Sequence, residues 1–409
     1  MKIFYIAEFD CSDHIGNAAH VRGVVNSLSW QGHQIYLFVA GWRPETGSNV
    51  RFIRIPQWRR RSLYSISFTV ACIPLLLWWL VRARPDIGYA RFFNTLPFLA
   101  FLFRLFRIPL VVEFNADQAT EHVAYGRNRL RRAFWRWAER TVYRNASGIV
   151  AVAPSIVDSL RRRFPRIDTP AVVIENGVNI DEYRPLDRTD CKSSLGLTPT
   201  ARYVVFVGAF QPWQGLETLV CAAPGIVAQV PEVVIILVGG TEAANRSMNE
   251  RLSALGIASH FLLPGAVAPD VAACYIGAGE VCVAPYNELA ADRISTGQAP
   301  PLRMKGSPLK VFSYLACGRP VVASDYQEAG RFVREIGAGL EFPRGDSDAL
   351  QQAVVFLLQQ PTLAARMGRD GAEYIRLHCT WQAVSARVTE FLDKIHSNYQ
   401  LAAAETKAV

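Results

Sequence analysis

The sequence predicts an α/β protein with two Rossmann-like domains, and three observations support this. Short runs of β-branched and aromatic residues alternate with stretches of helical length, as in parallel strands joined by crossover helices. This alternation stops at an Asn-Gly turn at 176–177 and starts again at 203–208. The 409 residues are also long for a single core and fit two domains of ordinary size.

Composition indicates a globular protein in a reducing compartment. Half of the residues are apolar and 19% are charged, which excludes a disordered chain. The eight cysteines are scattered, without a CxxC pair or a framework spacing, and therefore argue against a structural zinc site. Met1 and Lys2 lead directly into a strand-like run, so no signal peptide is expected.

Positive charge is concentrated in the first half of the chain. Residues 1–185 hold 25 Lys and Arg against 14 Asp and Glu, whereas the rest holds 19 against 21. Most of these cations are arginines beside long apolar, Trp-rich segments rather than beside a recognisable nucleic-acid-binding module. We therefore expect an anionic membrane surface as a partner and no nucleic acid. Solvated arginine faces are the alternative.

The first domain opens with a strand at 3–7, a loop, a helix from about 17 to 32 and a strand at 34–40. The pattern predicts further strands at 50–56, 86–90, 109–114, 148–153 and 172–178. It also predicts helices at 130–145 and 155–164. The last strand leads into the Asn-Gly turn, where both residue types tolerate positive φ.

The segment 63–81 holds nineteen residues without a charge, between arginines on both sides. As a helix it would be about 28 Å long, close to the length of a membrane span. If the flanking strands belong to one sheet, a span would place them on opposite sides of the bilayer, so a span is disfavoured. The segment is then a crossover helix packed on the sheet, or one that also presents apolar surface to lipid. The apolar run 92–106 and the tryptophans nearby favour membrane contact.

The second domain starts with a strand at 203–208, followed by the loop 209–217 and a helix. The pattern predicts strands at 233–239, 261–267, 281–285 and 321–323, and helices at 346–358 and 361–377. An amphipathic helix from Trp381 to about 399 and a frayed, Ala-rich tail from Leu401 end the chain. The loop 286–306 is longer than a mere connection needs to be.

The stretch 306–324 is the main candidate for a ligand site. Ser307 is a good N-cap, Pro308 suits the first helical position, and Gly318 ends the helix. A helix N-terminus carries unpaired N–H groups that attract phosphate, and Lys310 in the first turn adds a cation. An ordinary capped helix would have the same sequence features.

This stretch resembles the donor-site signature of the retaining family 4 glycosyltransferases, whose GT-B fold has two Rossmann-like domains facing across a cleft. The matching residues are Ser-Pro-Leu-Lys at 307–310 and Ala-Cys-Gly at 316–318. Two glutamates of the signature are replaced here, by Lys305 and Ser313.

Other parts of the chain resemble the same family. Gly16 and His20 match its glycine-loop entry, and Asn115 matches its Glu-x-Asn motif. The first loop of the second domain departs from the family, because Ala209 and Gln214 stand where it has an Arg and a Lys aimed at the donor diphosphate.

The resemblance implies an acceptor-binding domain at 1–185, a nucleotide-sugar-binding domain at 186–380, and a helix with a tail at 381–409 that crosses back to the first domain. It also implies three groups of site residues. These are catalytic Lys310, Asn115 and His20; donor-binding Gly208, Gln214, Val267, Gly306, Ser307, Pro308, Leu309 and Ser313; and acceptor-binding Gly16, Asn17 and Arg91. No metal or other cofactor is expected, because helix N–H groups and cations can neutralise a leaving diphosphate.

The implied function is that of a retaining, hexosyltransferase-type glycosyltransferase that is cytoplasmic and peripherally membrane-associated. It would move a sugar from a nucleoside-diphosphate sugar to a lipid-linked or surface-polysaccharide acceptor, in polysaccharide biosynthesis. The alternative is a catalytically silent protein of the same fold that binds a nucleotide or scaffolds a polysaccharide assembly complex, because four expected polar groups are replaced. A sugar-nucleotide epimerase on this architecture has no motif in its favour.

Overall fold

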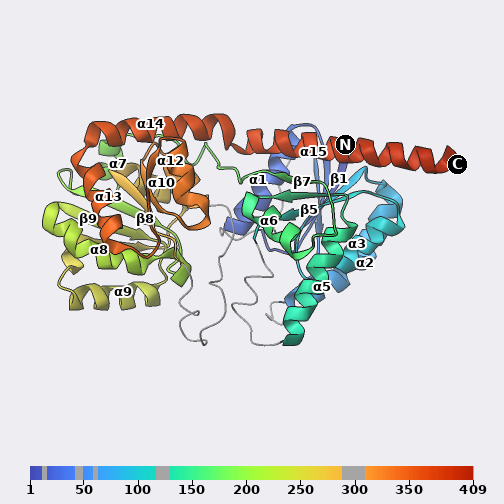
Figure 1. The fold of residues 1–409 in the computed structure, drawn as a ribbon, viewed down its shortest axis with the longest axis horizontal. Coiled ribbons are helices and arrows are strands. Elements are labelled where there is room, and N and C mark those ends of the chain that lie inside the picture. Colours follow the sequence, from blue (N-terminus) through green and yellow to red (C-terminus); the bar gives the residue numbers. More distant parts are fainter. Residues whose placement is uncertain (12–15, 42–48, 59–62, 117–128, 288–308, 409) are drawn as a thin grey trace. The chain divides into compact units, whose positions relative to one another are not determined.

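The computed structural model describes residues 1–408 except 12–15, 42–48, 59–62, 117–128 and 288–308 (Figure 1). The chain forms two compact units. Unit 1 contains Met1–Gly177 and the last helix, and unit 2 contains the described residues from Val178 to Thr380. This division assigns 178–185 to unit 2, whereas the resemblance had assigned them to the first domain. Each unit has one parallel sheet, so the predicted fold class is confirmed.

The sheet of unit 1 has seven parallel strands in the order β3-β2-β1-β4-β5-β6-β7. Their bounds are β1 Lys2–Ile6, β2 Gln34–Val39, β3 Val50–Arg54, β4 Ile87–Arg91, β5 Leu110–Phe114, β6 Gly148–Ala151 and β7 Ala171–Val173. The strand order reverses between β1 and β4, which pair with each other. All seven strands predicted for this domain are therefore present.

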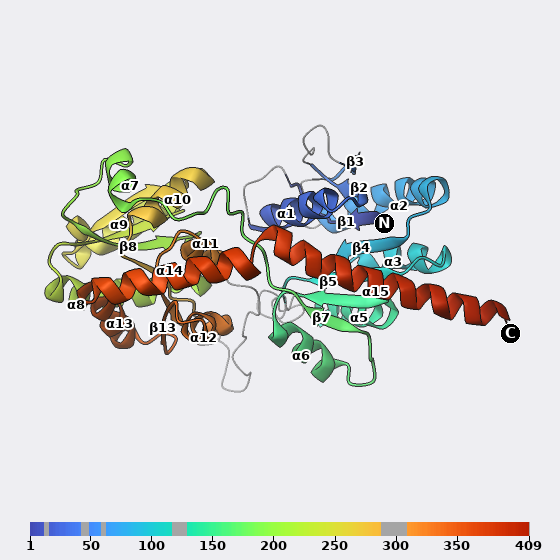
Figure 2. The ribbon, with the colours of Figure 1, turned by 90° about the horizontal axis from the view of Figure 1, so that it is seen from above.

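Helices cover both faces of this sheet (Figures 1 and 2). One face carries α1 (Gly16–Trp30) and α15 (Trp381–Ala408), whose apolar side chains form one buried cluster with the strands. The other face carries α2 (Tyr64–Ala83), α3 (Leu96–Leu105), α5 (Arg129–Asn145) and α6 (Pro154–Arg163) over a second cluster. Figure 2 shows α15 lying along the sheet, on the face that it shares with α1.

The α15 helix is fixed to unit 1 by Trp381 at its start. A Cβ on Gly23 would lie 2.2 Å from the Trp381 ring, and one on Gly177 would lie 2.6 Å from it, so glycine is needed at both positions. Farther along, the Gln31 amide donates to Ser385 Oγ over 2.8 Å. The predicted fraying from Leu401 is wrong, because the helix continues to Ala408. The alanines in this tail are strong helix formers.

The apolar segment predicted at 63–81 is helix α2, which contains Pro74. By length and composition α2 could cross a membrane, and one third of its most apolar window is buried. However, α2 connects β3 to β4, and both strands belong to the same sheet. A crossover helix packed on the sheet, which both remaining alternatives predict, is confirmed, since Phe68, Cys72 and Leu76 are fully buried against the sheet. Contact of its outer side with lipid stays a prediction.

The sheet of unit 2 has six parallel strands in the order β10-β9-β8-β11-β12-β13. Their bounds are β8 Arg202–Val207, β9 Val233–Val238, β10 Phe261–Gly265, β11 Val281–Ala284, β12 Val321–Ser324 and β13 Gly339–Phe342. The sequence analysis missed β13, a four-residue strand that starts with glycine. Alternate residues of these strands form one buried cluster with the apolar side chains of residues 216–226 and 350–358.

The helices of unit 2 include several that the sequence analysis did not predict. The α-helices are α7 Arg188–Ser194, α8 Leu216–Gln229, α9 Glu242–Ala254, α10 Pro269–Ala278, α11 Leu309–Ala316, α12 Ala329–Glu335, α13 Ser347–Gln359 and α14 Pro361–His378. The short helices α7, α10 and α12 and the polar α9 were missed. The helix of the predicted donor motif is α11, and Gly318 follows its end with φ of 73°, as expected.

Candidate functional site

The strand order of unit 2 reverses between β8 and β11. In open α/β sheets ligands bind beyond the carboxyl ends of the strands at such a topological switch point. Gly208 follows β8, and Pro285 and Tyr286 follow β11. A Cβ on Gly215 would lie only 1.6 Å from the Pro285 carbonyl oxygen, and Gly215 has φ of 72°. Glycine therefore lets the loop after β8 approach the end of β11.

Lys310, the second residue of α11, reaches this switch point. Its Nζ lies 3.8 Å from the centroid of the Phe206 ring and 4.9 Å from that of Tyr286. It donates a hydrogen bond to Gln214 Oε1. A Cβ on Gly208 would be 3.0 Å from Nζ, so the glycine also leaves room for the ammonium. The structure thus brings three predicted site residues, Lys310, Gln214 and Gly208, together.

The charge of Lys310 is poorly compensated in unit 2. No described carboxylate forms an ion pair with it, and its polar partner is the neutral amide of Gln214. Burial lowers the pKa of Lys310 well below its usual value. The faces of two aromatic rings offset part of the cost of burying the charge. Among the described residues the site offers one buried lysine amine and no carboxylate, and an anionic ligand would favour the charged form of that amine.

The loop after β8 offers backbone donors beside Lys310. The amide of Gly208 itself donates to the Val238 carbonyl over 2.9 Å, so it is not available to a ligand. The next two amides, of Ala209 and Phe210, donate to no described residue. These amides stand near the position where the family has an arginine.

The other predicted donor-side residues are less closely gathered. Leu309 begins α11, and Ser313 donates its hydroxyl back to the Leu309 carbonyl over 3.4 Å, a weak bond within its own helix. Val267 lies just beyond β10, at the same edge of the sheet but three strands from β11. Gly306, Ser307 and Pro308 lie outside the described residues, as does Lys305.

Unit 1 has its own switch point between β1 and β4, and Glu113 at the end of β5 organises it. Glu113 Oε1 lies 2.5 Å from Nε2 of His20 and accepts a hydrogen bond from Asn115. Glu113 Oε2 accepts from the Tyr89 hydroxyl over 2.6 Å. The predicted catalytic residues His20 and Asn115, which are far apart in the sequence, therefore share one carboxylate.

The Glu113 carboxylate is ionised although it is buried. Burial on its own would raise its pKa, but the charge and hydrogen bond of His20, together with Arg91 and Tyr89, lower the pKa to about 2. A buried charge with this many partners is rigid. Glu113 can therefore fix the orientation of the His20 ring and of the Asn115 amide.

Arg91 is the last residue of β4 and lies beside Glu113 in the sheet. Its guanidinium stands 4.9 Å from the Phe9 ring centroid. Gly16 and Asn17 begin α1, the helix that also carries His20. Arg91 thus lies beside the Glu113 group, and Gly16 and Asn17 lie about one helical turn before His20 in the sequence.

Glu8 is a candidate residue that the sequence analysis missed. It follows β1 at the switch point, and burial raises its pKa to about 7, although a hydrogen bond with Ser65 and the charge of Arg91 act in the opposite direction. A carboxyl group that titrates near neutral pH is suited to proton transfer. The sequence signal was its position directly after the first strand.

Among the described residues, no group of three or more His, Cys, Asp or Glu side chains could hold a metal ion. All eight cysteines are free thiols.

Two family models match the chain. The model described as "Glycosyltransferase Family 4" matches residues 16–182, and the model described as "Glycosyl transferases group 1" matches residues 201–360. The first match contains the Glu113 group, and the second contains Lys310 and Gln214.

Curated relatives are similar at low identity. A phosphatidyl-myo-inositol mannosyltransferase of Mycobacterium leprae (strain TN) is 25% identical over 404 residues, covering 97% of this chain and 97% of the relative. A GDP-mannose-dependent alpha-(1-6)-phosphatidylinositol monomannoside mannosyltransferase of Mycobacterium tuberculosis (strain CDC 1551 / Oshkosh) is 26% identical over 260 residues, covering 62% of this chain and 64% of that relative.

Solved structures share the fold. The sucrose-phosphate synthase of Thermosynechococcus elongatus superposes with a TM-score of 0.78 at 19% identity, covering 97% of this chain and 99% of that one. The superposition therefore extends over both units of this chain. This likeness identifies the GT-B fold.

Proposed function

This chain is a glycosyltransferase built from a family 4 domain and a group 1 domain, and on that premise we propose its reaction. It transfers a sugar, with retention of configuration, from a nucleoside-diphosphate sugar to a lipid-linked or surface-polysaccharide acceptor. It does so at the cytoplasmic face of the membrane, to which it is peripherally attached.

The proposal rests on the buried ammonium group of Lys310. Sugar transfer releases a nucleoside diphosphate, so negative charge grows on the leaving oxygen as the glycosidic bond breaks. Lys310 has no described counterion and stands at the switch point where ligands of such sheets bind. It stabilises the departing diphosphate together with the amides of Ala209 and Phe210, and this role requires no metal cofactor.

GDP-mannose is the first donor to test. The Mycobacterium tuberculosis relative is named as GDP-mannose-dependent, and the Mycobacterium leprae relative is named as a mannosyltransferase. Both names also contain phosphatidylinositol or its derivative, which favours a lipid-linked acceptor. The Glu113 group of unit 1 would then hold a hydroxyl-bearing acceptor through His20 and Asn115.

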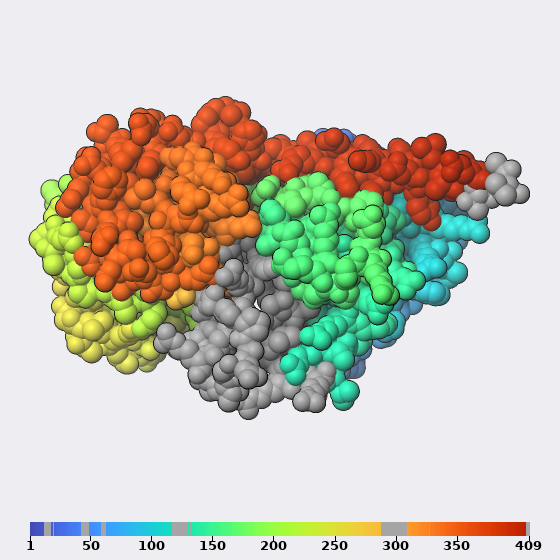
Figure 3. Space-filling model, in the orientation of Figure 1, coloured from blue at the N-terminus to red at the C-terminus, as the bar shows by residue number. Residues whose placement is uncertain are grey.

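A surface of unit 1 supports membrane attachment. Helix α5 is open to the surface in the space-filling view (teal, Figure 3). Exposed aromatic side chains lie on it and on its neighbour α3, and the rings of Phe98 and Trp137 are 5.9 Å apart. Phe101 is 62% exposed, and Trp78 of α2 is 52% exposed beneath the Arg82 guanidinium. Aromatic rings beside arginines suit the headgroup region of an anionic bilayer.

The first experiment is a thermal-shift series with GDP, UDP, ADP and their common sugar conjugates. A nucleotide present at 100 times its dissociation constant should add about 2.7 kcal/mol of stability. We expect one base to shift the melting temperature, and Lys310→Ala to abolish the shift. Flat curves with every nucleotide at millimolar concentration, from folded protein, would contradict the proposed donor site.

Vesicle sedimentation tests the attachment. We expect binding to vesicles rich in phosphatidylglycerol, weak binding to phosphatidylcholine vesicles, and a clear loss in Phe101→Ser and Trp137→Ser. Trp30→Ser is the matched control, since Trp30 is 67% exposed but ends α1 on the opposite face of the sheet. Equal losses in the control and the two variants would argue against this surface.

A further inference from the structure

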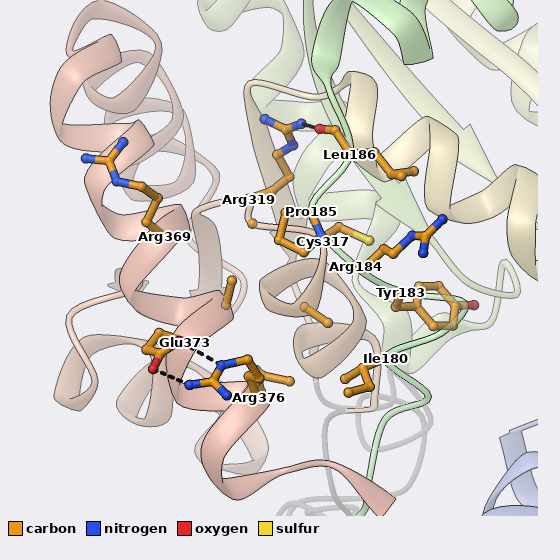
Figure 4. Close-up of a pocket in the computed structure, with 14 residues that line it drawn as sticks. Ile180, Tyr183, Arg184, Pro185, Leu186, Cys317, Arg319, Arg369, Glu373 and Arg376 are labelled. Atoms are coloured by element: carbon orange, nitrogen blue, oxygen red, sulfur yellow. Dashed lines mark hydrogen bonds and ion pairs between the residues drawn. The ribbon is translucent and has the colours of Figure 1, made fainter.

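Unit 2 contains a second pocket that the proposed reaction does not use. It is bounded by residues 180–186, by the residues after α11 and by α14 (Figure 4). Its volume is about 410 Å³. Small-molecule sites in proteins range over roughly 300–1,000 Å³, so the pocket can hold a metabolite or a short lipid chain.

This pocket is separate from the proposed donor site. Lys310 is the second residue of α11, whereas the pocket is lined by Cys317 and Arg319, beyond the other end of that helix. A helix of eight residues spans about 12 Å. None of the residues lining the pocket belongs to the predicted donor set.

The lining is apolar with an excess of positive charge. Four arginines and one carboxylate face the pocket, and the carboxylate is already neutralised, because Arg376 donates to Glu373 over 2.7 and 2.9 Å. Arg184, Arg319 and Arg369 form no ion pair with any described residue. Much of the remaining wall is aliphatic. The pocket therefore suits an anion that carries an apolar body.

Arg319 is the residue best placed to hold that anion. It is only 8% exposed, and Nη2 donates to the Leu186 carbonyl over 2.9 Å. Its Nε is buried and has no hydrogen-bond partner among the described residues. Burial, and then the neighbouring charge of Arg188, lower the pKa of Arg319. Burying a cation beside a second cation is costly. A bound anion would accept a hydrogen bond from Nε of Arg319 and reduce the repulsion between Arg319 and Arg188.

Figure 4 shows how the arginines are arranged. The side chains of Arg319 and of Arg369 from α14 both extend upward in this view, and the Arg376–Glu373 pair lies below them. Two guanidinium groups that extend in the same direction match the charge and the oxygen geometry of a phosphate better than those of a carboxylate.

We propose that this pocket binds a phosphate monoester with an apolar body, with its phosphate at Arg319 and Arg369 and its body along the aliphatic wall. The ligand joins α11 to α14 and to the segment 180–186, which directly follows the boundary at Gly177. The source of the phosphate is a lipid or a soluble phosphoester, and the test separates the two.

The test is calorimetric titration of the full chain with hexyl phosphate, inorganic phosphate and hexanol. We expect saturable binding of hexyl phosphate at least tenfold tighter than that of inorganic phosphate, and none of hexanol. Affinity that rises again from hexyl to decyl phosphate identifies a lipid ligand, and affinity that does not rise identifies a soluble one. Absence of hexyl phosphate binding at millimolar concentration would overturn the proposal.

Two variants locate the site. Arg319→Gln should weaken hexyl phosphate at least thirtyfold. Ala372→Trp fills the pocket from α14 and keeps the charge of Arg319, and it should also weaken hexyl phosphate at least thirtyfold. This second variant keeps the test valid if Arg319→Gln does not fold. Arg366→Gln, an exposed arginine of α14 outside the pocket, is the matched control and should bind normally. Unchanged binding in Ala372→Trp would overturn the proposal, whereas nucleotide binding at Lys310 should persist in all three variants.

Discussion

The switch points of the two units have the same architecture and opposite electrostatics. In unit 1 the charge at the sheet edge is an anion, Glu113, which is satisfied by His20, Asn115 and Tyr89. In unit 2 it is a cation, Lys310, whose polar partner is one neutral amide. The first charge is compensated by neighbouring side chains, although Nδ1 of His20 has no hydrogen-bond partner among the described residues. The second charge is one that a ligand can neutralise.

This difference shows how one fold can serve two kinds of ligand. A buried carboxylate that neighbouring side chains already compensate does not attract a cation, and the side chains that it holds in place are suited to orienting hydroxyl groups. The cost of burying an uncompensated cation falls when an anion binds beside it, so this site is suited to an anionic ligand. The following predictions test this contrast, from the largest expected effect to the smallest.

Removing the central carboxylate should break the unit 1 network. Glu113→Ala should lower the free energy of unfolding by about 3–5 kcal/mol, because it leaves buried polar partners unsatisfied. Since the pKa of Glu113 is lowered to about 2, its contribution is present above about pH 4.5 and is lost as the pH falls toward 2. Denaturant unfolding between pH 2 and 7 measures both effects. Glu175→Ala, which removes an exposed pair with Arg387, is the control and should cost less than about 1 kcal/mol.

Removing the cation of unit 2 should affect catalysis rather than folding. Lys310→Met should lower kcat/KM by about 10²–10³-fold, the usual effect of losing one group that stabilises transition-state charge. The melting temperature should not fall, because a buried charge is removed. Lys394→Met, an exposed lysine of α15, is the control. A loss below tenfold would mean that another group carries the diphosphate charge.

Placing a carboxylate beside Lys310 should compensate its charge within unit 2, as the charge of Glu113 is compensated within unit 1. Gln214→Glu places a carboxylate where Lys310 now meets an amide, so it should weaken nucleotide binding by about 1.5–3 kcal/mol, or roughly 10–150-fold. Titration with the nucleotide found by thermal shift measures this. Gln211→Glu adds the same charge at an exposed position of the same loop and serves as the control. Equal weakening in both variants would indicate a general charge effect rather than a pair with Lys310.

The smallest effect concerns Glu8, a carboxyl at the unit 1 switch point whose pKa is raised. Because its pKa is about 7 when folded, its contribution to stability is present below about pH 4.5 and is lost as the pH rises through 7. Glu8→Gln should therefore raise the free energy of unfolding by about 1–2 kcal/mol at pH 8 and by little at pH 4. A uniform change at both pH values would contradict the titration.

The sequence predicted the sheets better than the sites, for physical reasons. Runs of β-branched residues such as 203–208 identify buried strands directly, and the charge-free segment 63–81 could be assigned to a crossover once its flanking strands were recognised. The shared carboxylate of His20 and Asn115 could not be predicted, because it depends on which strands become neighbours. The motif around Lys310 predicted the cation but not the two aromatic rings beside it. Phe206 and Tyr286 are far from Lys310 in the sequence, and the fold of the sheet brings them to it.

Local propensity also misled at particular places. The tail after Leu401 is predicted to fray because chain termini are often poorly ordered, but its alanines extend the helix. The short strand β13 begins with glycine and has no alternating pattern. The sequence indicates that Gln214 replaces a lysine of the family. The structure shows the Gln214 amide oxygen accepting a hydrogen bond from Lys310.

The discontinuity of unit 1 has a consequence for how the protein is made. The ring of Trp381 fills the space left by Gly23 and Gly177, and Val384, Val388 and Leu392 follow it into the same core. A ribosome synthesises these residues only after all of unit 2. The first unit to be translated is therefore the last to be completed, and until then the apolar face that α15 covers is open to chaperones.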